Sequence, residues 1–328
     1  MLRLLSVVLS LLLPSVAAAS CDGKDMIATL SDSDRAILAD RTAATPFPNG
    51  LLWQAEKGNT AITLFGTYHF EHDQTAIHLE RLKPMIDQAD AVYLEVSNAD
   101  QDQMQRALAD DPSIMFITDG DTLPDLLGED DWQRLSSEMQ ARAIPGFMAA
   151  KFKPFWAAMM LGIGPCEARN ALTQKNGIDA QIGDYASEIG KDSRSLEDFR
   201  ALLTLFDSFP QEDQLDMIRL MFSMSEDADD MAYTLRQRYL SQEIALIWEY
   251  SRLVTLQSGR EGAEEEFDLF ERQFLVQRNQ DWIDVLKAET PGQNLFIAVG
   301  AAHLPGTFGV LHLLQDEGFT IRRLPFDS

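Results

Sequence analysis

Residues 61–69 read Ala-Ile-Thr-Leu-Phe-Gly-Thr-Tyr-His, an apolar run of strand length that ends in glycine, two further residues and histidine. The same order returns near the end of the chain, where the apolar run 294–299 is followed by Gly, Ala, Ala and His303. A single Gly-x-x-His is a weak signal in a chain with 19 Gly and 5 His, whereas two copies that both follow an apolar run are much less easily accidental. The pattern therefore predicts a structural unit that occurs twice.

Each motif lies inside a unit of strand, turn, helix and strand. In the first unit, apolar residues repeat on one face of a helix over 75–89, and a second apolar run covers 91–96. In the second unit, a helix over 307–317 is followed by a strand over 319–324. A further apolar run at 51–53 predicts one more strand. These units predict an α/β fold in which the strand-Gly-x-x-His-helix-strand unit is duplicated.

The middle of the chain, from about residue 99 to 290, is mostly helical in its apolar spacing. A short strand is expected at 193–197, because Gly190 ends the helix before it. The expected helices cover 131–143, 178–190, 211–224 and, as one long run, 227–256. We predict that residues 21–328 form a single domain with a helical insertion at about 99–290, because the two motifs at opposite ends of the chain must meet to build one site.

The first twenty residues have the composition of a secretory signal peptide. Arg3 precedes an apolar run over 4–13, and Pro14 and a stretch of small residues lead to Ser20. This apolar run is too short to span a membrane, and no later window approaches the roughly 20 apolar residues that a span needs. We therefore predict an exported, periplasmic protein without a transmembrane segment.

Cys21 has two interpretations. Ala18-Ala19-Ser20-Cys21 is a tolerable lipoprotein cleavage box, which predicts a lipid anchor on Cys21. Cys166 is the other cysteine of the chain, and two cysteines in an oxidising compartment most simply form one disulfide. We favour the Cys21–Cys166 bridge, with the lipoprotein as second choice, because the box lacks the usual leucine and lipidation leaves Cys166 unpaired.

The charge and the missing motifs exclude several classes of function. The chain has 27 Lys plus Arg against 52 Asp plus Glu, a net charge of -25, so its surface repels nucleic acids and anionic lipids. We expect no nucleic-acid partner. A Gly-x-Ser-x-Gly elbow is missing, and so is a glycine-rich phosphate loop, which argues against serine hydrolases and nucleotide-binding proteins.

The candidate site consists of His69, His303 and Glu95. Ligands of open α/β sheets bind at the carboxyl ends of the strands, where both histidines follow a glycine that allows a sharp turn. Glu95 lies near the end of an apolar strand, where a carboxylate is costly unless it is paired or ligating. Two imidazoles and a carboxylate suit a divalent metal. His72 is a further candidate ligand, although a solvated loop or helix start is the simpler interpretation.

These motifs resemble those of the exported TraB, PrgY and GumN proteins, whose superfamily includes the Tiki metalloproteases and, more distantly, erythromycin esterases and haem-binding ChaN proteins. The resemblance covers nearly the whole chain after the signal peptide. The marks that carry it are the two Gly-x-x-His motifs, Gly306-x-x-Gly309, Tyr93-Leu94-Glu95, Gly177-Ile178-Asp179, Leu196-Glu197 and Arg278-Asn279.

The resemblance implies a mixed central sheet built from two related halves with a large helical insertion between them. It also implies that His69 and His303 are the site histidines, that Glu95 is their acidic partner, and that Arg278 faces the same pocket. There Arg278 would hold a substrate carboxylate or stabilise an oxyanion. Glu197 is a weaker site candidate.

The function that these observations predict is that of an exported, metal-dependent hydrolase of the Tiki and TraB type. The ligand set does not distinguish Mn, Co, Fe and Zn, and the chain has no His-Glu-x-x-His helix, so it is not an ordinary zincin. A bound metal would activate water and polarise a carbonyl, with a peptide or other small molecule as substrate. The alternative is a non-catalytic periplasmic binding or regulatory protein that uses the same pocket for a peptide, a signal molecule or a metal-bearing ligand.

Overall fold

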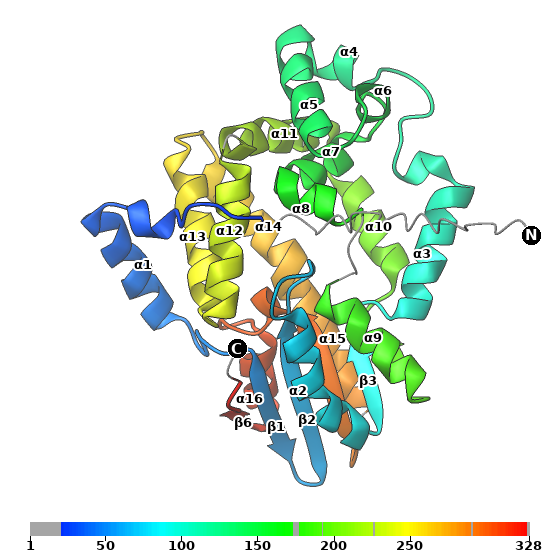
Figure 1. Ribbon diagram of the computed structural model, residues 1–328, viewed down its shortest axis with the longest axis vertical. Coiled ribbons are helices and arrows are strands. Elements are labelled where there is room, and N and C mark those ends of the chain that lie inside the picture. Colours follow the sequence, from blue (N-terminus) through cyan, green and yellow to red (C-terminus); the bar gives the residue numbers. More distant parts are fainter. Residues whose placement is uncertain (1–20, 173–176, 192, 226, 290, 327–328) are drawn as a thin grey trace, which may run out of the picture.

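The structure is a computed structural model that describes residues 21–172, 177–191, 193–225, 227–289 and 291–326. The predicted signal peptide lies outside these residues. A six-stranded mixed sheet forms the base of the molecule, with helices on both of its faces (Figure 1). The strands, in spatial order, are β4 (Ser193–Ser195), β3 (Ala91–Leu94), β5 (Asn294–Gly300), β2 (Thr60–Thr67), β1 (Leu52–Lys57) and β6 (Thr320–Arg323). The predicted mixed α/β sheet is therefore confirmed.

The two Gly-x-x-His motifs follow neighbouring parallel strands. β2 pairs with β5 from Ala61 opposite Asn294 to Thr67 opposite Gly300, and β3 pairs in parallel with both β5 and β4. The strands β1 and β6 complete the sheet through antiparallel pairs. Because four adjacent strands are parallel, their carboxyl ends lie at one edge of the sheet, and both motifs are brought together there.

The central strands are apolar throughout because helices cover both of their faces. On one face, Leu295, Ile297 and Val299 of β5 pack against α15 (Gln277–Glu289) and α16 (Val310–Asp316). On the other face, alternate residues of β5 pack against α2 (Thr75–Gln88) and α9 (Ile178–Glu188). Burying each such side chain stabilises the fold by roughly 1.5–3 kcal/mol, so the strand ends form a firm base for a site.

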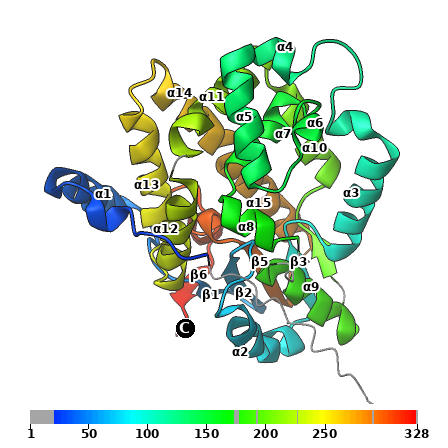
Figure 2. The ribbon, with the colours of Figure 1, turned by 45° about the horizontal axis from the view of Figure 1, so that its top comes forward.

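The remaining helices gather beyond the carboxyl ends of the parallel strands, above the sheet in Figure 1, and the turned view of Figure 2 shows the same layer. Part of this layer has a core of its own, to which Leu135, Met139, Ile218 and Phe222 contribute. Their bounds are η1 (Ile27–Thr29), α1 (Asp32–Ala44), α3 (Asn98–Asp110), η2 (Pro112–Ile114), α4 (Leu123–Leu127), α5 (Glu129–Ala141), α6 (Gly146–Ala149), α7 (Pro154–Leu161), α8 (Pro165–Asn170), α10 (Phe199–Ser208), α11 (Gln211–Ser225), α12 (Ala228–Leu240), α13 (Ile244–Gln257), α14 (Ala263–Glu271) and the π-helix η3 (Arg272–Val276). Whether this layer is an insertion within a single domain stays a prediction.

Two predicted helices differ from the observed ones. The expected continuous helix over 227–256 is two helices, α12 and α13, because the chain bends at Gln242, whose φ is 60°. The Gln242 side chain holds this bend by donating to the carbonyl of Phe326 and accepting from Arg323. The last helix begins at Val310 instead of residue 307, since Gly306 adopts a φ of 100° in the turn before it.

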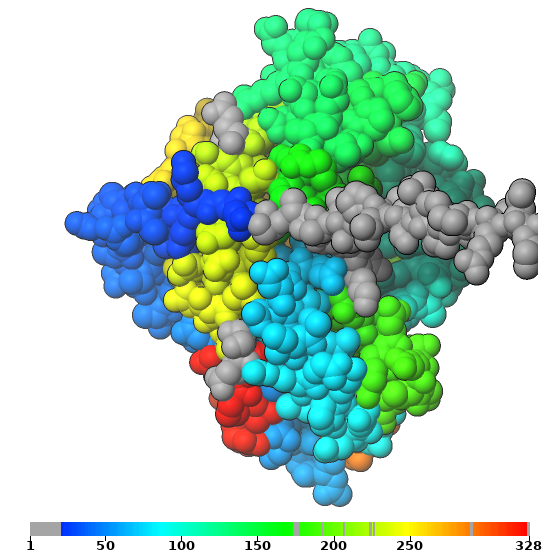
Figure 3. All heavy atoms as spheres, viewed as in Figure 1, coloured from blue at the N-terminus to red at the C-terminus, as the bar shows by residue number. Residues whose placement is uncertain are grey.

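The start of the described chain crosses the helical layer. Helix α1 packs against α13, and Figure 3 shows this blue segment against the yellow surface of α12 and α13. Cys21 forms a disulfide with Cys166, with their Cα atoms 5.6 Å apart, so the predicted bridge is confirmed. Among the described residues, no helix combines the length and the apolar character that a membrane span requires.

Candidate functional site

Gly300, the last residue of β5, lies where the three predicted site residues converge. A Cβ atom placed on Gly300 would be 3.1 Å from Oε1 of Glu95, 3.5 Å from Nε2 of His69 and 3.6 Å from Cδ2 of His303. The backbone N–H of Gly300 donates to Oε1 of Glu95 at 2.6 Å. The absence of a side chain at this position leaves a shared space in front of two imidazoles and a carboxylate.

His303 is buried and held in one orientation. Its Nδ1 lies 2.6 Å from Oδ1 of Asn279, and the amide nitrogen of Asn279 donates to the carbonyl of Phe308 at 2.8 Å. Because this second bond fixes the Asn279 oxygen toward the ring, Nδ1 of His303 carries the hydrogen and donates it. The lone pair of Nε2 therefore faces the site, 3.8 Å from Oε1 of Glu95.

The environment of His303 keeps the imidazole neutral. Burial lowers the pKa of His303 to about 3, and the positive charges of Arg278 and His69 add to this effect against the opposing charge of Glu95. The ring also packs against Trp282, with centroids 4.4 Å apart and planes tilted by 40°. At neutral pH, His303 presents an unprotonated nitrogen to the shared space.

His69 has the opposite character. Its side chain is 59% exposed, and Nδ1 lies 3.5 Å from Oδ1 of Asp179 in the first turn of α9. Neighbouring atoms desolvate the ring and lower its pKa, but the Asp179 carboxylate, helped by Glu95, outweighs this and raises the pKa of His69 to about 9. His69 is therefore a cation at neutral pH.

Gly177 explains how Asp179 reaches His69. A Cβ atom on Gly177 would be 2.3 Å from both the carbonyl carbon and the carbonyl oxygen of His69, so only glycine allows α9 to start against this backbone. The Gly177-Ile178-Asp179 sequence thus brings a helix start to the loop after β2, with its aspartate beside the imidazole.

Arg278 joins the two carboxylates of the site. From α15 it donates through Nε to Glu197 at 2.8 Å and through Nη2 to Glu95 at 2.7 Å. Its guanidinium lies over Trp282 at 5.0 Å, and Nη1 is 3.3 Å from Nε2 of His303. The Arg278 side chain is 15% exposed, so it is a buried member of the cluster and not an ordinary surface arginine.

The two carboxylates differ in their affinity for a proton. Burial raises the pKa of Glu95, but His303, Arg278, His69 and the Gly300 N–H more than offset this and bring it to about 2. For Glu197, burial dominates and its pKa is raised, although Arg278 opposes the effect. Glu95 is therefore the firmly ionised member of the pair, and Glu197 belongs to the same cluster, as the sequence suggested.

The residues fit a divalent cation in donor chemistry. A neutral His303, an ionised Glu95 and, once deprotonated, His69 supply the nitrogen and oxygen ligands that such an ion takes, around a space that any Cβ at Gly300 would fill. Within the described part of the chain, no group of three His, Cys, Asp or Glu side chains is already spaced for ligation. Arg278 lies beside both His303 and Glu95, so an ion held there requires Arg278 to turn toward Glu197.

His72 lies away from these donors. Its side chain is 9% exposed, and its ring packs against Tyr68, His78 and Tyr239, so it is not solvated, although it does lie just before the start of α2, as expected. Its backbone N–H donates to Oγ1 of Thr75 at 2.9 Å, which ties the loop to the start of α2. We assign it to the support of the loop that carries His69.

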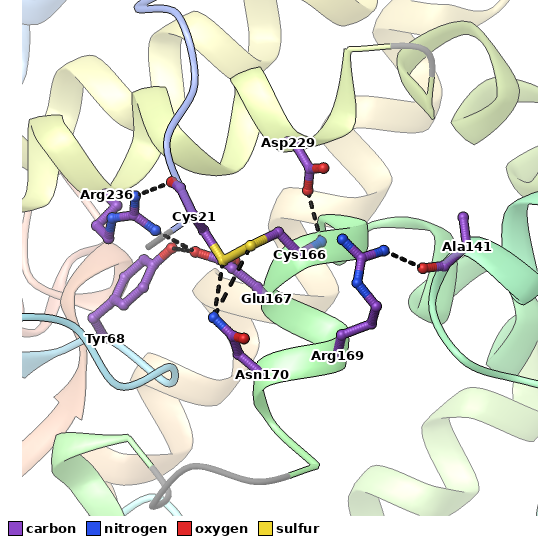
Figure 4. Close-up of a disulfide and its surroundings, with 9 residues drawn as sticks. All are labelled: Cys21, Tyr68, Ala141, Cys166, Glu167, Arg169, Asn170, Asp229 and Arg236. Atoms are coloured by element: carbon purple, nitrogen blue, oxygen red, sulfur yellow. Dashed lines mark hydrogen bonds and ion pairs between the residues drawn. A yellow bond between two sulfur atoms is a disulfide. The ribbon is translucent and has the colours of Figure 1, made fainter. Parts of the chain in front are cut away.

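The disulfide lies close to this loop (Figure 4). Tyr68, directly before His69, donates to Oε1 of Glu167 at 3.0 Å, and Arg236 contacts the same oxygen at 3.3 Å. Arg236 also donates to the carbonyl of Cys21, while Glu167 follows Cys166 in the chain. The bridge therefore anchors the partners of Tyr68, one residue away from the site.

Asp179 and Asn279 are the site residues that sequence reasoning missed. Each lies within a segment that was singled out, Gly177-Ile178-Asp179 and Arg278-Asn279, but neither was assigned a role. The glycine two residues before Asp179 was the available signal for a close helix approach. Asn279 has no comparable signal, because its role depends on the position of His303.

Comparison with known proteins identifies a family. A sequence model of the TraB/PrgY/gumN family matches residues 51–323, which include every residue of the site described above. No curated protein matches the chain.

Proposed function

This chain belongs to the TraB/PrgY/gumN family, and we propose that it is an exported, metal-dependent hydrolase that cleaves peptide bonds. The observation that carries the proposal is the convergence of His69, Glu95 and His303 on the space in front of Gly300. In this proposal these three side chains hold the ion, which supplies activation of water and polarisation of a carbonyl group.

The protein's own groups prepare the ligands and receive the substrate. Asn279 holds the tautomer of His303 that keeps Nε2 unprotonated, and His69 gives up its proton when it joins the ligand set. Glu197 binds Nε and Nη2 of Arg278, which leaves Nη1 directed toward the site. From there Arg278 donates to the substrate oxygen as negative charge develops on it.

The test combines metal binding with peptide cleavage. Purified protein without the first twenty residues is titrated with Mn, Co and Zn by calorimetry and then incubated with a peptide library. We expect about one equivalent of ion to bind with release of a proton below pH 9, and cleavage to require that ion. Substituting His303→Ala should remove both binding and cleavage.

Two further variants sharpen this test. Gly300→Ala keeps every ligand but places a methyl group 3.1 Å from Oε1 of Glu95, so it should weaken ion binding at least tenfold while the protein remains folded. His312→Ala, on α16, is the matched control and should behave as wild type. Cleavage that survives in both His69→Ala and His303→Ala would sink the proposal.

A non-catalytic binding protein is the second candidate. It is favoured by the ion pairs that Arg278 already forms with Glu95 and Glu197, which satisfy the charges of the cluster without a ligand. Stoichiometric binding of the ion with no turnover of any peptide would support this candidate over the hydrolase.

A further inference from the structure

A cavity of about 550 Å³ lies inside the helical layer, between α7, α11, α13, α14 and η3. Its volume falls within the range of roughly 300–1,000 Å³ that is typical of small-molecule sites. None of its lining residues belongs to the ligand set proposed above. The cavity is therefore a second concave surface whose use has to be explained separately.

The walls of this cavity are apolar and partly adaptable. The rings of Phe155, Phe209 and Phe274 are nearly parallel, with planes 4–12° apart and centroids separated by 5.8–6.4 Å. Met159 and Met217 also line it, and unbranched thioether side chains adjust readily to the shape of an apolar ligand. Such walls favour a flat or extended hydrocarbon group over a polar one.

The charges at the cavity are largely neutralised. The carboxylates of Asp213, Asp216 and Glu266 are among the lining residues. Arg219 pairs with Asp216 at 2.8 Å and Arg260 pairs with Glu266, so the apolar walls, and not a net charge, decide which group the cavity accepts.

Two large apolar side chains of the lining are open to solvent. Met159 is 39% exposed and Phe270 is 37% exposed. Exposed apolar surface beside a cavity is a common mark of a binding site, because a ligand removes that surface from water. These two residues therefore indicate the side from which a ligand enters.

One segment connects the cavity to the candidate active site. The ring of Phe274 lines the cavity, and its backbone carbonyl accepts from Nη1 of Arg278 at 3.1 Å. Phe274 belongs to the π-helical turn η3, a distortion that is often found at functional sites. A group that contacts Phe274 would lie within about one helical turn of the cation of the site.

We infer that this cavity binds an aromatic or long aliphatic side chain of the substrate next to Arg278. Its role in substrate selection rests on the proposed hydrolase function. Because burial of a large apolar side chain removes it from water, the cavity would select peptides that carry such a residue close to the cleaved bond.

The direct test uses the neutral fluorescent probe N-phenyl-1-naphthylamine. Wild-type protein should bind it saturably. Ala158→Phe, which fills the cavity, and Met217→Gln, which makes its wall polar, should each weaken binding at least tenfold. Phe147→Gln is the matched control, because Phe147 is 78% exposed on α6 and does not line the cavity, and this variant should bind within twofold of wild type.

The outcomes separate this inference from the proposed function. The inference would be overturned if wild-type protein does not bind the probe saturably. It would also be overturned if both cavity variants bind the probe as wild type does while their unfolding temperatures match that of wild type. Saturable binding that both variants weaken supports it, even if no peptide is cleaved, in which case only the hydrolase proposal fails. Where peptides are cleaved, Ala158→Phe should abolish the preference for large apolar residues.

Discussion

The two Gly-x-x-His motifs place identical side chains at neighbouring strand ends and give them opposite properties. His69 is largely exposed, lies beside the Asp179 carboxylate and has a pKa raised to about 9. His303 is buried, donates to the neutral amide of Asn279 and has a pKa lowered to about 3. The strand and the glycine after it place each imidazole in the site. The residue beside Nδ1 of each ring, Asp179 or Asn279, then helps to determine whether that ring is protonated.

This difference shows how a duplicated unit can provide two functions. A pair of titratable groups whose environments separate their pKa values can act as acid and base, or as a proton carrier and a permanent ligand. His303 is suited to bind an ion at any pH above about 3, whereas His69 must first release a proton. Experiments on the partner residues therefore test the site more directly than removal of the histidines.

Arg278→Ala should break the arrangement around His303 most severely. It leaves Glu95 and Glu197 as unpaired carboxylates that are 18% and 12% exposed, and removal of one partner from a buried ion pair costs about 3–5 kcal/mol. Urea unfolding measures the loss. The control is Arg200→Ala, whose side chain is 65% exposed and 3.7 Å from Asp198, and this change should cost less than about 1 kcal/mol. Equal losses in the two variants would show that the cluster does not stabilise the fold.

Exchanging the partner residues should reduce the difference between the pKa values of His69 and His303. Asp179→Asn removes the charge beside His69 and should lower its pKa by about 1–3 units, while Asn279→Asp places a charge beside His303 and should raise its pKa by a similar amount. NMR titration of isotope-labelled imidazoles measures both changes. Unmoved curves for His69 and His303 would refute the partner mechanism.

The smallest expected effect is a pair of opposite pH trends in stability. The pKa of His303 in the folded protein lies below the unfolded value of about 6.5. Its contribution to the free energy of unfolding is therefore fully present above pH 6.5 and is reduced by about 2 kcal/mol at pH 5. The pKa of His69 in the folded protein lies above 6.5. Its contribution to the free energy of unfolding is therefore fully present below pH 6.5 and is lost as the pH rises through 9. Solvent screening keeps that contribution at about 1 kcal/mol or less.

Urea unfolding at pH 5, 7 and 9 measures these trends as differences between wild type and each variant. The loss caused by His303→Gln should grow from pH 5 to pH 7, and the loss caused by His69→Gln should shrink from pH 7 to pH 9. Burial also lowers the pKa values of His72 and His78 to about 4. Because both residues are present in wild type and in each variant, their contributions to the pH dependence cancel in these differences. Parallel trends in the two variants would contradict the assigned protonation states.

The sequence allowed prediction of the sheet and its site edge because β2, β3 and β5 are short apolar runs with helices between them. Buried parallel strands leave this pattern, and glycine at the ends of β2 and β5 marks the turns toward the ligand side. The strand β1 was predicted too short, since its second half carries Glu56 and Lys57 on the hairpin with β2. The apolar run identified the strand but not its length.

The partners of the histidines were beyond sequence reasoning for a physical reason. Asp179 is one of 52 acidic residues, and only the packing of α9 against the backbone of His69 distinguishes it. Similarly, the bend at Gln242 has no glycine or proline to announce it, because contacts with Phe326 and Arg323 hold it. Local patterns predict elements, whereas these features arise from residues that meet only in the folded chain.

The strand order has a consequence for how the molecule is made. β5 lies between β2 and β3, although the chain has completed both of those strands by residue 94 and does not reach β5 until residue 294. During synthesis on the ribosome, the facing edges of β2 and β3 have no native partner while the rest of the helical layer emerges. Unpaired strand edges of this kind can pair with strands of other chains. A chain that stops before β5 lacks both His303 and the strand that closes the sheet. Incomplete copies therefore lack part of the candidate site and also leave two strand edges of the sheet unpaired.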